Sequence, residues 1–293
     1  MPCIRRKSIQ KSDLLNQTTD LNHEIEQKVL AGEFHLPVLP VIATQVINMA
    51  ADPNADLEEL SKLVHQDQSL AGHVLRISNS ALYARDTPIR TLNEAINLLG
   101  FTAIREMATV ISIKNQVFQH RDFTHEIKVI WKHALLSGFY AKEIAGMIGK
   151  DTEIPFICGL LHTVGKPILF QLLIDLGGAA IFEGGNEMIP INLAERYHTF
   201  VGKQAAEKWN LPGEVSACCE FFKERWEAGE HRQTVAIIIL SSRLAKWCQF
   251  TDRNLKTNIE HDSVLKELEL TPDQLTDLFE LKESMMESIK ALN

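Results

Sequence analysis

The 293-residue sequence has no CxxC pair, no long hydrophobic run and no excess of positive charge. Its five cysteines are an odd number without regular spacing, which is unlike a disulfide framework, so we expect reduced thiols. The strongest apolar run, near 235–240, is far shorter than the ~20 residues that span a bilayer. No apolar segment follows the basic residues near the N-terminus, as a secretory signal would require. We therefore expect a cytoplasmic protein without membrane insertion.

The charge balance is acidic. Lys and Arg number 30 against 38 Asp and Glu, which gives a net charge of −8. Bulk binding to nucleic acid needs a concentrated positive field, so this balance argues against it. Hydrophobic residues make up 45% and charged residues 23%, which are ordinary globular values. The length fits one large domain or two small ones.

Apolar residues recur every three or four positions from about residue 41 onward, and no sustained period-2 pattern occurs, so the sequence predicts an all-α fold. Capping boxes begin helices at Thr91 and Thr271. Gly100 is expected to end the helix that starts after Thr91, with another helix around Ile104–Ile111. The longest apolar stripe runs over 127–148. Further helices are predicted at about 154–162, 167–176, 190–209, 213–227 and 232–249.

We expect two packed helical lobes with an extension at each end. Polar stretches at 119–123 and 251–262 are candidate seams, and 177–185, with two Gly-Gly pairs, is a predicted loop. Gly165 is expected to end a helix, because the residues around it lack the pattern of a phosphate-binding loop. The predicted organisation is a partly helical N-terminal extension (1–33), an N-terminal lobe (34–118), a second lobe (119–250), and a linker with a C-terminal helix (251–293).

Three of the eleven histidines stand among apolar or small residues on predicted helices, namely His133, His162 and His198. Each is therefore expected to point inward. A buried histidine is usually a hydrogen-bonded core residue, but three converging imidazoles are also the ligand type that zinc and other divalent metals prefer. Both interpretations stay open at this point.

The order of motifs resembles the HDOD domain, an output-domain relative of the HD metal-dependent phosphohydrolases. The resemblance covers roughly 34–250 and includes the helix 95–100 and the segment around Asn79-Ser80. The remaining motifs are Leu36–Pro40, Trp131–His133, Gly159–His162, His198 with Val201-Gly202, and Trp209–Pro212. The family resemblance implies two helical lobes, the second related to the HD-domain fold.

The resemblance also implies which residues would form a metal site. Active HD proteins hold two metal ions with histidines, an adjacent His-Asp pair and a late Asp. Here His133, His162 and His198 match ligand positions, but Thr163 and Ser242 stand where Asp is expected. Phe222 and Lys223 stand near the expected His-His pair. We therefore expect no enzyme activity, no cofactor and no metal. If a metal binds, the three histidines would hold it.

A polar cluster in the predicted first lobe is the other candidate site. One interpretation is that Asn79 and Ser80 only end a helix. The other is a surface that contacts a partner or an anionic ligand. The cluster contains Arg76, Asn79, Ser80, Tyr83, Arg85 and Arg90.

The sequence thus predicts a non-catalytic bacterial signalling module that binds a protein partner or a small ligand, with a nucleotide-type ligand as one possibility. Two alternatives remain. The first is a nucleotide-binding protein, and the second is a residual phosphohydrolase that uses three histidines and one metal ion.

Overall fold

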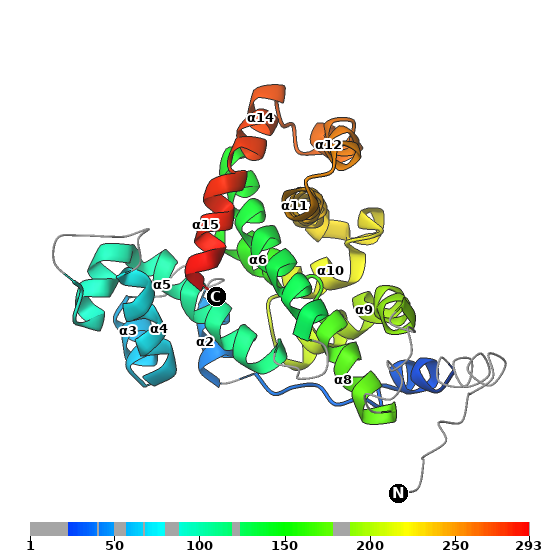
Figure 1. The fold of residues 1–293 in the computed structure, drawn as a ribbon, viewed down its shortest axis with the longest axis horizontal. Helices are drawn as coiled ribbons and strands as arrows, with labels where there is room; N and C mark the ends of the chain where they lie inside the picture. Colours follow the sequence, from blue (N-terminus) through cyan, green and yellow to red (C-terminus); the bar gives the residue numbers. More distant parts are fainter. Residues whose placement is uncertain are drawn as a thin grey trace, which may run out of the picture.

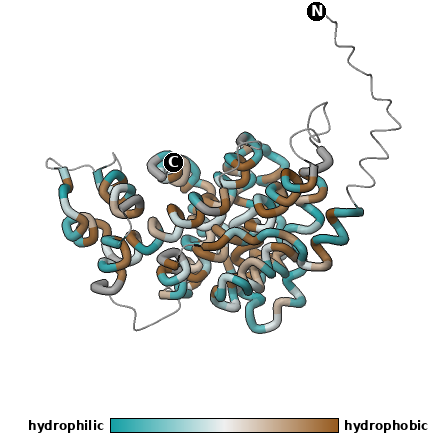
Figure 2. The backbone as a smooth tube through the Cα atoms, turned by 90° about the horizontal axis from the view of Figure 1, so that it is seen from below, coloured by the Kyte–Doolittle hydropathy of each residue, from teal (hydrophilic) through white to brown (hydrophobic). Residues whose placement is uncertain are grey.

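The computed structural model describes residues 23–39, 41–49, 57–66, 68–79, 88–118, 124–177 and 188–292. Every regular element within these ranges is helical, so the all-α expectation is confirmed (Figure 1). Two predicted features, the seam at 119–123 and most of the loop at 177–185, lie outside the described residues. A smaller lobe of α2 to α5 stands beside a larger lobe around α6, and apolar residues gather in the interior of the larger one (Figure 2).

The smaller lobe contains α2 (Val41–Met49), α3 (Leu57–Gln66), α4 (Gln68–Ser78) and α5 (Leu92–Val117), and the other three all pack on α5. Helix α5 begins with the expected capping box, in which Thr91 and Glu94 each accept a hydrogen bond from the other's backbone N–H. Gly100 has φ 78° and breaks the helix into two parts bent by 114°. Glycine adopts this left-handed conformation without a Cβ penalty, so its predicted role as a helix end is confirmed.

The larger lobe is built around α6 (Thr124–Met147) and α11 (Arg232–Phe250), which pack against each other. It is completed by α7 (Glu153–Leu161), α8 (Gly165–Gly177), α9 (Met188–Lys208) and α10 (Gly213–Phe221).

Two predictions in this lobe are wrong. The helix expected over 213–227 ends at Phe221, and two short 3-10 turns follow at Arg225–Glu227 and Gly229–His231. These turns bring the guanidinium groups of Arg225 and Arg232 to the Glu267 carboxylate. Gly165 does not end a helix but begins α8. A Cβ at Gly165 would lie 2.0 Å from the backbone oxygen of His198, so glycine is required for the close approach of α8 and α9.

The segment 251–292 adds four helices, α12 (Arg253–Glu260), α13 (Ser263–Glu267), α14 (Pro272–Glu280) and α15 (Lys282–Leu292). Helix α14 begins with the expected capping box at Thr271 and with Pro272 in its first turn. Helix α12 occupies most of the stretch expected to be a polar seam, with Asp252 as its N-cap. Because α12 packs on α11, and α14 and α15 pack on α6, this segment extends the larger lobe.

Residues 23–39 form an N-terminal strap. The strap begins beside α8 and α9 of the larger lobe and then runs to α2 in the smaller lobe (Figure 1). The indole Nε1 of Trp209 donates a 2.8 Å hydrogen bond to the backbone oxygen of Pro37. Ile25 and Val29 are fully buried. The larger lobe therefore contains chain from both ends of the sequence.

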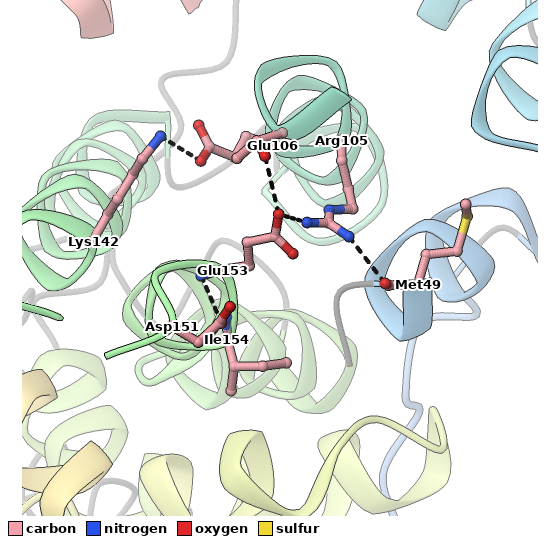
Figure 3. A network of polar contacts seen from close by, with 8 residues as sticks. Met49, Arg105, Glu106, Lys142, Asp151, Glu153 and Ile154 are labelled. Carbon is pink, nitrogen blue, oxygen red and sulfur yellow. Dashed lines mark hydrogen bonds and ion pairs between the residues drawn. The ribbon is translucent and has the colours of Figure 1, made fainter. Parts of the chain in front are cut away.

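Partly buried ion pairs join the lobes (Figure 3). The Arg105 guanidinium on α5 contacts the Glu153 carboxylate on α7 and donates to the backbone oxygen of Met49 at 2.9 Å. Lys142 on α6 donates to Glu106 on α5 at 2.6 Å. Burial raises the pKa of Glu106, and the Lys142 charge partly offsets this. Removing one partner of such a pair strands a charge in the interior, so these contacts fix how α5 sits on the larger lobe.

Within the described chain, one helical stretch is long and apolar enough to cross a membrane, and a pair of bent helices would be a second if it formed a single span. One is Glu153–Leu176, and the other is the bent pair Leu92–Gly100 and Thr102–Asn115. In Glu153–Leu176, 83% of the most apolar part of the stretch is buried inside the protein. A core helix of a soluble protein has the same property, so the finding is weak evidence for a span.

Candidate functional site: a histidine cluster

Four elements of the larger lobe bring the predicted site residues together. His133 lies on α6, His162 directly follows α7, His198 lies on α9 and Ser242 lies on α11. The ring centroids of His133 and His162 are 5.5 Å apart. The rings of His162 and His198 both contact the phenyl ring of Phe222, at 5.3 and 5.5 Å between centroids.

A chain of hydrogen bonds links two of the histidines through Ser242. His162 Nδ1 lies 2.7 Å from the backbone oxygen of Gly159, which only accepts, so this nitrogen carries the proton. His162 Nε2 is then an acceptor, and the Ser242 hydroxyl 3.3 Å away donates to it. The Ser242 oxygen in turn accepts from His133 Nε2 at 3.1 Å. The imidazole nitrogens that face each other are therefore already hydrogen-bonded.

His198 occupies a different environment. Its side chain is fully buried, and neither ring nitrogen has a hydrogen-bond partner among the described residues. The nearest carboxylate oxygen, from Glu195 one turn earlier on α9, is 3.8 Å from Nε2. The Thr163 hydroxyl, which stands where the relatives' Asp is expected, is also buried and unpartnered. Unlike the His162 ring, which is hydrogen-bonded, the His198 ring is buried and packs against Phe222.

Two lysines lie beside the cluster. The Lys166 ammonium contacts the Glu195 carboxylate, and Lys223 donates a 2.6 Å hydrogen bond to the Glu195 backbone oxygen. Glu195 was not singled out in the sequence, although its position three residues before His198 could have suggested a contact. No sequence motif marks Lys166, and its charge lies close enough to lower the pKa of all three histidines.

The environment keeps all three imidazoles neutral at neutral pH. Burial lowers the pKa of His162 to about 4. Burial also takes the pKa values of His133 and His198 well below the usual 6.5, and the nearby Lys166 charge lowers them further. The charged groups beside the cluster are the ammonium groups of Lys166 and Lys223 and the Glu195 carboxylate, which contacts Lys166 and lies 3.8 Å from His198 Nε2.

This donor set does not fit the two-metal centre of active HD proteins. Such a centre needs carboxylates to balance the charge of the ions, and the two residues that the family resemblance places there, Thr163 and Ser242, carry neutral hydroxyls. The Phe222 ring lies against two of the histidines, and Lys223 adds a positive charge. Among the described residues, no group of three His, Cys, Asp or Glu side chains is arranged to hold a metal ion.

The first-lobe cluster is only partly visible. Arg76 and Arg90 are exposed, whereas Ser80, Tyr83 and Arg85 lie outside the described residues. Asn79 has a clear structural role. Its side chain donates to the backbone oxygens of Leu75 and Ile89, each at 2.9 Å, and accepts from the Ile89 N–H at 2.8 Å. It therefore ties the end of α4 to the residues just before α5.

The four cysteines in the described part of the chain are all buried. Cys218 and Cys219 are both fully buried. Burial raises the pKa of the Cys218 thiol well above its usual value, so the thiol is not activated as a nucleophile.

The HDOD domain model matches residues 36–224. This chain belongs to the HDOD family. The match includes the smaller lobe and most of the histidine cluster, while Ser242 and the four C-terminal helices lie beyond it.

Similar proteins agree with this assignment. An uncharacterized protein of Treponema pallidum is 24% identical over 210 residues, and the match covers 69% of this chain but only 40% of that protein. An HDOD domain protein of unknown function from Geobacter sulfurreducens has a TM-score of 0.68 at 21% identity, covering 95% of this chain and 98% of its own.

Two further solved structures share the fold. A candidate signal transduction protein from Marinobacter aquaeolei has a TM-score of 0.72 at 21% identity, with coverage of 94% of this chain and 65% of that one. A candidate metal-dependent phosphohydrolase from Shewanella amazonensis has a TM-score of 0.69 at 17% identity, covering 95% of this chain and 100% of its own. Identities this low establish the shared fold and not a shared activity.

Proposed function

We propose that this HDOD protein is a non-catalytic, cytoplasmic signalling module that acts by binding a partner. The observation that carries the proposal is the Ser242 hydroxyl, which hydrogen-bonds to both His133 and His162. A carboxylate at this position would hold a metal ion, whereas the hydroxyl hydrogen-bonds to the Nε2 atoms that would otherwise be metal ligands. Two neighbours also oppose metal binding. The Phe222 ring covers faces of two histidines, and the positive charge of Lys223 repels a cation.

The test is a combined metal and hydrolysis measurement. After dialysis against Mn²⁺ or Zn²⁺, we expect the protein to retain substoichiometric metal and to hydrolyse neither cyclic dinucleotides nor phosphomonoesters. As a matched gain-of-site variant, Thr163→Asp combined with Ser242→Asp supplies the missing carboxylates and should raise metal retention. Turnover by the unaltered protein that His162→Ala abolishes would instead support the three-histidine metalloenzyme.

The exposed arginines of the smaller lobe are the proposed partner-binding surface. Their planar donor forks suit carboxylate or phosphate groups, and Arg is enriched at interfaces. We expect Arg76→Ala and Arg90→Ala to leave the melting temperature nearly unchanged and to weaken capture of a partner identified by co-purification. Asn79→Ala is the structural control, and it should cost about 1 kcal/mol, as the loss of a helix cap does.

The capture experiment also locates the site if this assignment is wrong. Should both arginine variants capture the partner fully while a His133 or His162 variant does not, the binding surface lies in the larger lobe.

A second candidate, an anionic nucleotide ligand, is favoured by the two lysines beside the histidine cluster. The ammonium groups of Lys166 and Lys223 both lie near His198, and Lys166 shares its charge with the Glu195 carboxylate. A thermal-shift series with mono-, di- and cyclic dinucleotides tests this. A shift that Lys223→Gln removes would support it, and the absence of any shift would leave the protein-partner proposal alone.

A further inference from the structure

A cavity of about 560 Å³ lies among the C-terminal helices, outside the part of the chain that the family model matches. Its walls come from α11, α12, α13 and α14, together with residues between α13 and α14. Trp247, Leu265, Leu275 and Phe279 supply apolar lining. Its volume falls in the range of 300 to 1,000 Å³ that is typical of small-molecule pockets, and its lining mixes apolar with polar and charged residues.

The aromatic rings of this cavity already attract ammonium groups. Trp247 and Phe279 pack edge to face, with 4.8 Å between their centroids. The Lys256 Nζ lies 4.6 Å from the centre of the Phe279 ring, and the Lys282 Nζ lies 5.4 Å from that of Trp247. The negative potential of a ring face stabilises a cation in this position.

Two carboxylates also line the cavity, Glu260 from α12 and Glu280 from α14. Neither forms an ion pair or side-chain hydrogen bond with any described residue. Lys256, the cation among the lining residues, lies one helical turn before Glu260 but is placed over Phe279 instead. The lining therefore combines an apolar aromatic surface with one more negative than positive charge.

We propose that this cavity binds a small organic cation, an ammonium group carried on an apolar chain or ring. The apolar body would pack against Leu265, Leu275 and the aromatic rings. The ammonium group would pair with Glu260 or Glu280 and share the ring faces that the lysines now use. An anionic ligand of the same shape would be repelled by two carboxylates and would meet a single lysine.

A set of probes that differ only in charge tests the proposal. 4-Phenylbutylammonium, 4-phenylbutanol and 4-phenylbutyrate are each titrated into the full chain at physiological salt, and binding is measured by ligand-observed NMR. We expect the ammonium to bind about tenfold more tightly than the alcohol, because it pairs with carboxylates in a partly exposed site. The carboxylate probe should bind most weakly of the three.

Variants then locate the binding. Glu260→Gln and Glu280→Gln should each weaken ammonium binding by about threefold while leaving the alcohol unchanged. Glu287→Gln on α15 is the matched control, because this exposed residue does not line the cavity. Thr276→Trp places a large ring at the exposed rim and should reduce binding of all three probes.

Three outcomes would overturn the proposal. One is a carboxylate probe that binds as tightly as the ammonium, and another is ammonium binding that neither Gln variant changes. The third is an ammonium probe that shows no saturable binding up to about 5 mM, which is weaker than a fragment that fills an apolar pocket should bind. Circular dichroism of each variant separates lost binding from lost folding.

Discussion

Lowering the pH from 7 to about 4 is expected to reduce the free energy of unfolding by about 3 kcal/mol through His162 alone. The unfolded chain takes up a proton on this imidazole near pH 6.5, whereas the folded chain does so only near pH 4, because burial disfavours the charged ring. The stabilisation from the neutral ring is therefore complete above pH 6.5 and is lost as the pH falls through this window. His133 and His198, whose pKa values are also lowered, act in the same direction.

Urea unfolding at several pH values between 7 and 4 measures this effect. Each buried histidine adds up to about 1.4 kcal/mol per pH unit to the slope, so the three together should give a steep loss of stability. His162→Asn should flatten the curve, while His261→Asn, an exposed histidine outside the cluster, should not. A stability that stays constant over this range would contradict the buried, neutral arrangement of the cluster.

The second large effect is expected from Gly165→Ala. The added methyl would lie 2.0 Å from the backbone oxygen of His198 and 2.8 Å from the backbone nitrogen of Gly202. Backbone atoms cannot move aside as a flexible side chain can, so α8 and α9 must separate. We expect a loss of more than about 3 kcal/mol in the free energy of unfolding, at the upper end of overpacking effects.

Gly72→Ala is the matched control for this substitution. Gly72 lies within α4, and a Cβ there would meet nothing within 4 Å. Alanine should therefore stabilise the protein by up to about 1 kcal/mol through helix propensity. Should Gly165→Ala fail to fold, Gly202→Ala, with its nearest contact at 3.3 Å, is expected to show a milder loss. Equal stability of Gly165→Ala and the unaltered protein would contradict the close approach of the two helices.

The elements that the sequence predicted are those whose signals are local. Each capping box, at Thr91 and at Thr271, is a four-residue pattern that marks a helix start. Gly100 adopts a positive φ that other residues avoid. The prediction for Gly165 is wrong because glycine is required there by the close approach to His198. His198 is 33 positions away in the sequence, so no local pattern indicates this contact. The early end of α10 has a similar cause, since Arg225 turns toward Glu267.

The histidine cluster shows the same division. The residue types and the family resemblance indicated which side chains belong to one region, and the structure brings His133 and His162 to 5.5 Å. The sequence could not show that Ser242 hydrogen-bonds to both rings or that Phe222 lies against His162 and His198. Such contacts depend on how α6, α10 and α11 pack. The position of Glu195 beside two lysines depends on packing in the same way.

The N-terminal strap has a consequence for the order in which the chain can fold during synthesis. The contact between Pro37 and Trp209 joins positions 172 residues apart, and Glu26 reaches Arg196 across 170. During synthesis the strap leaves the ribosome first, and its docking surface on α9 is made much later. Ile25 and Val29, which are buried in the folded protein, therefore stay unpacked while more than half of the chain is added. Closing so long a loop is slow, and the strap is therefore expected to dock after the larger lobe has formed.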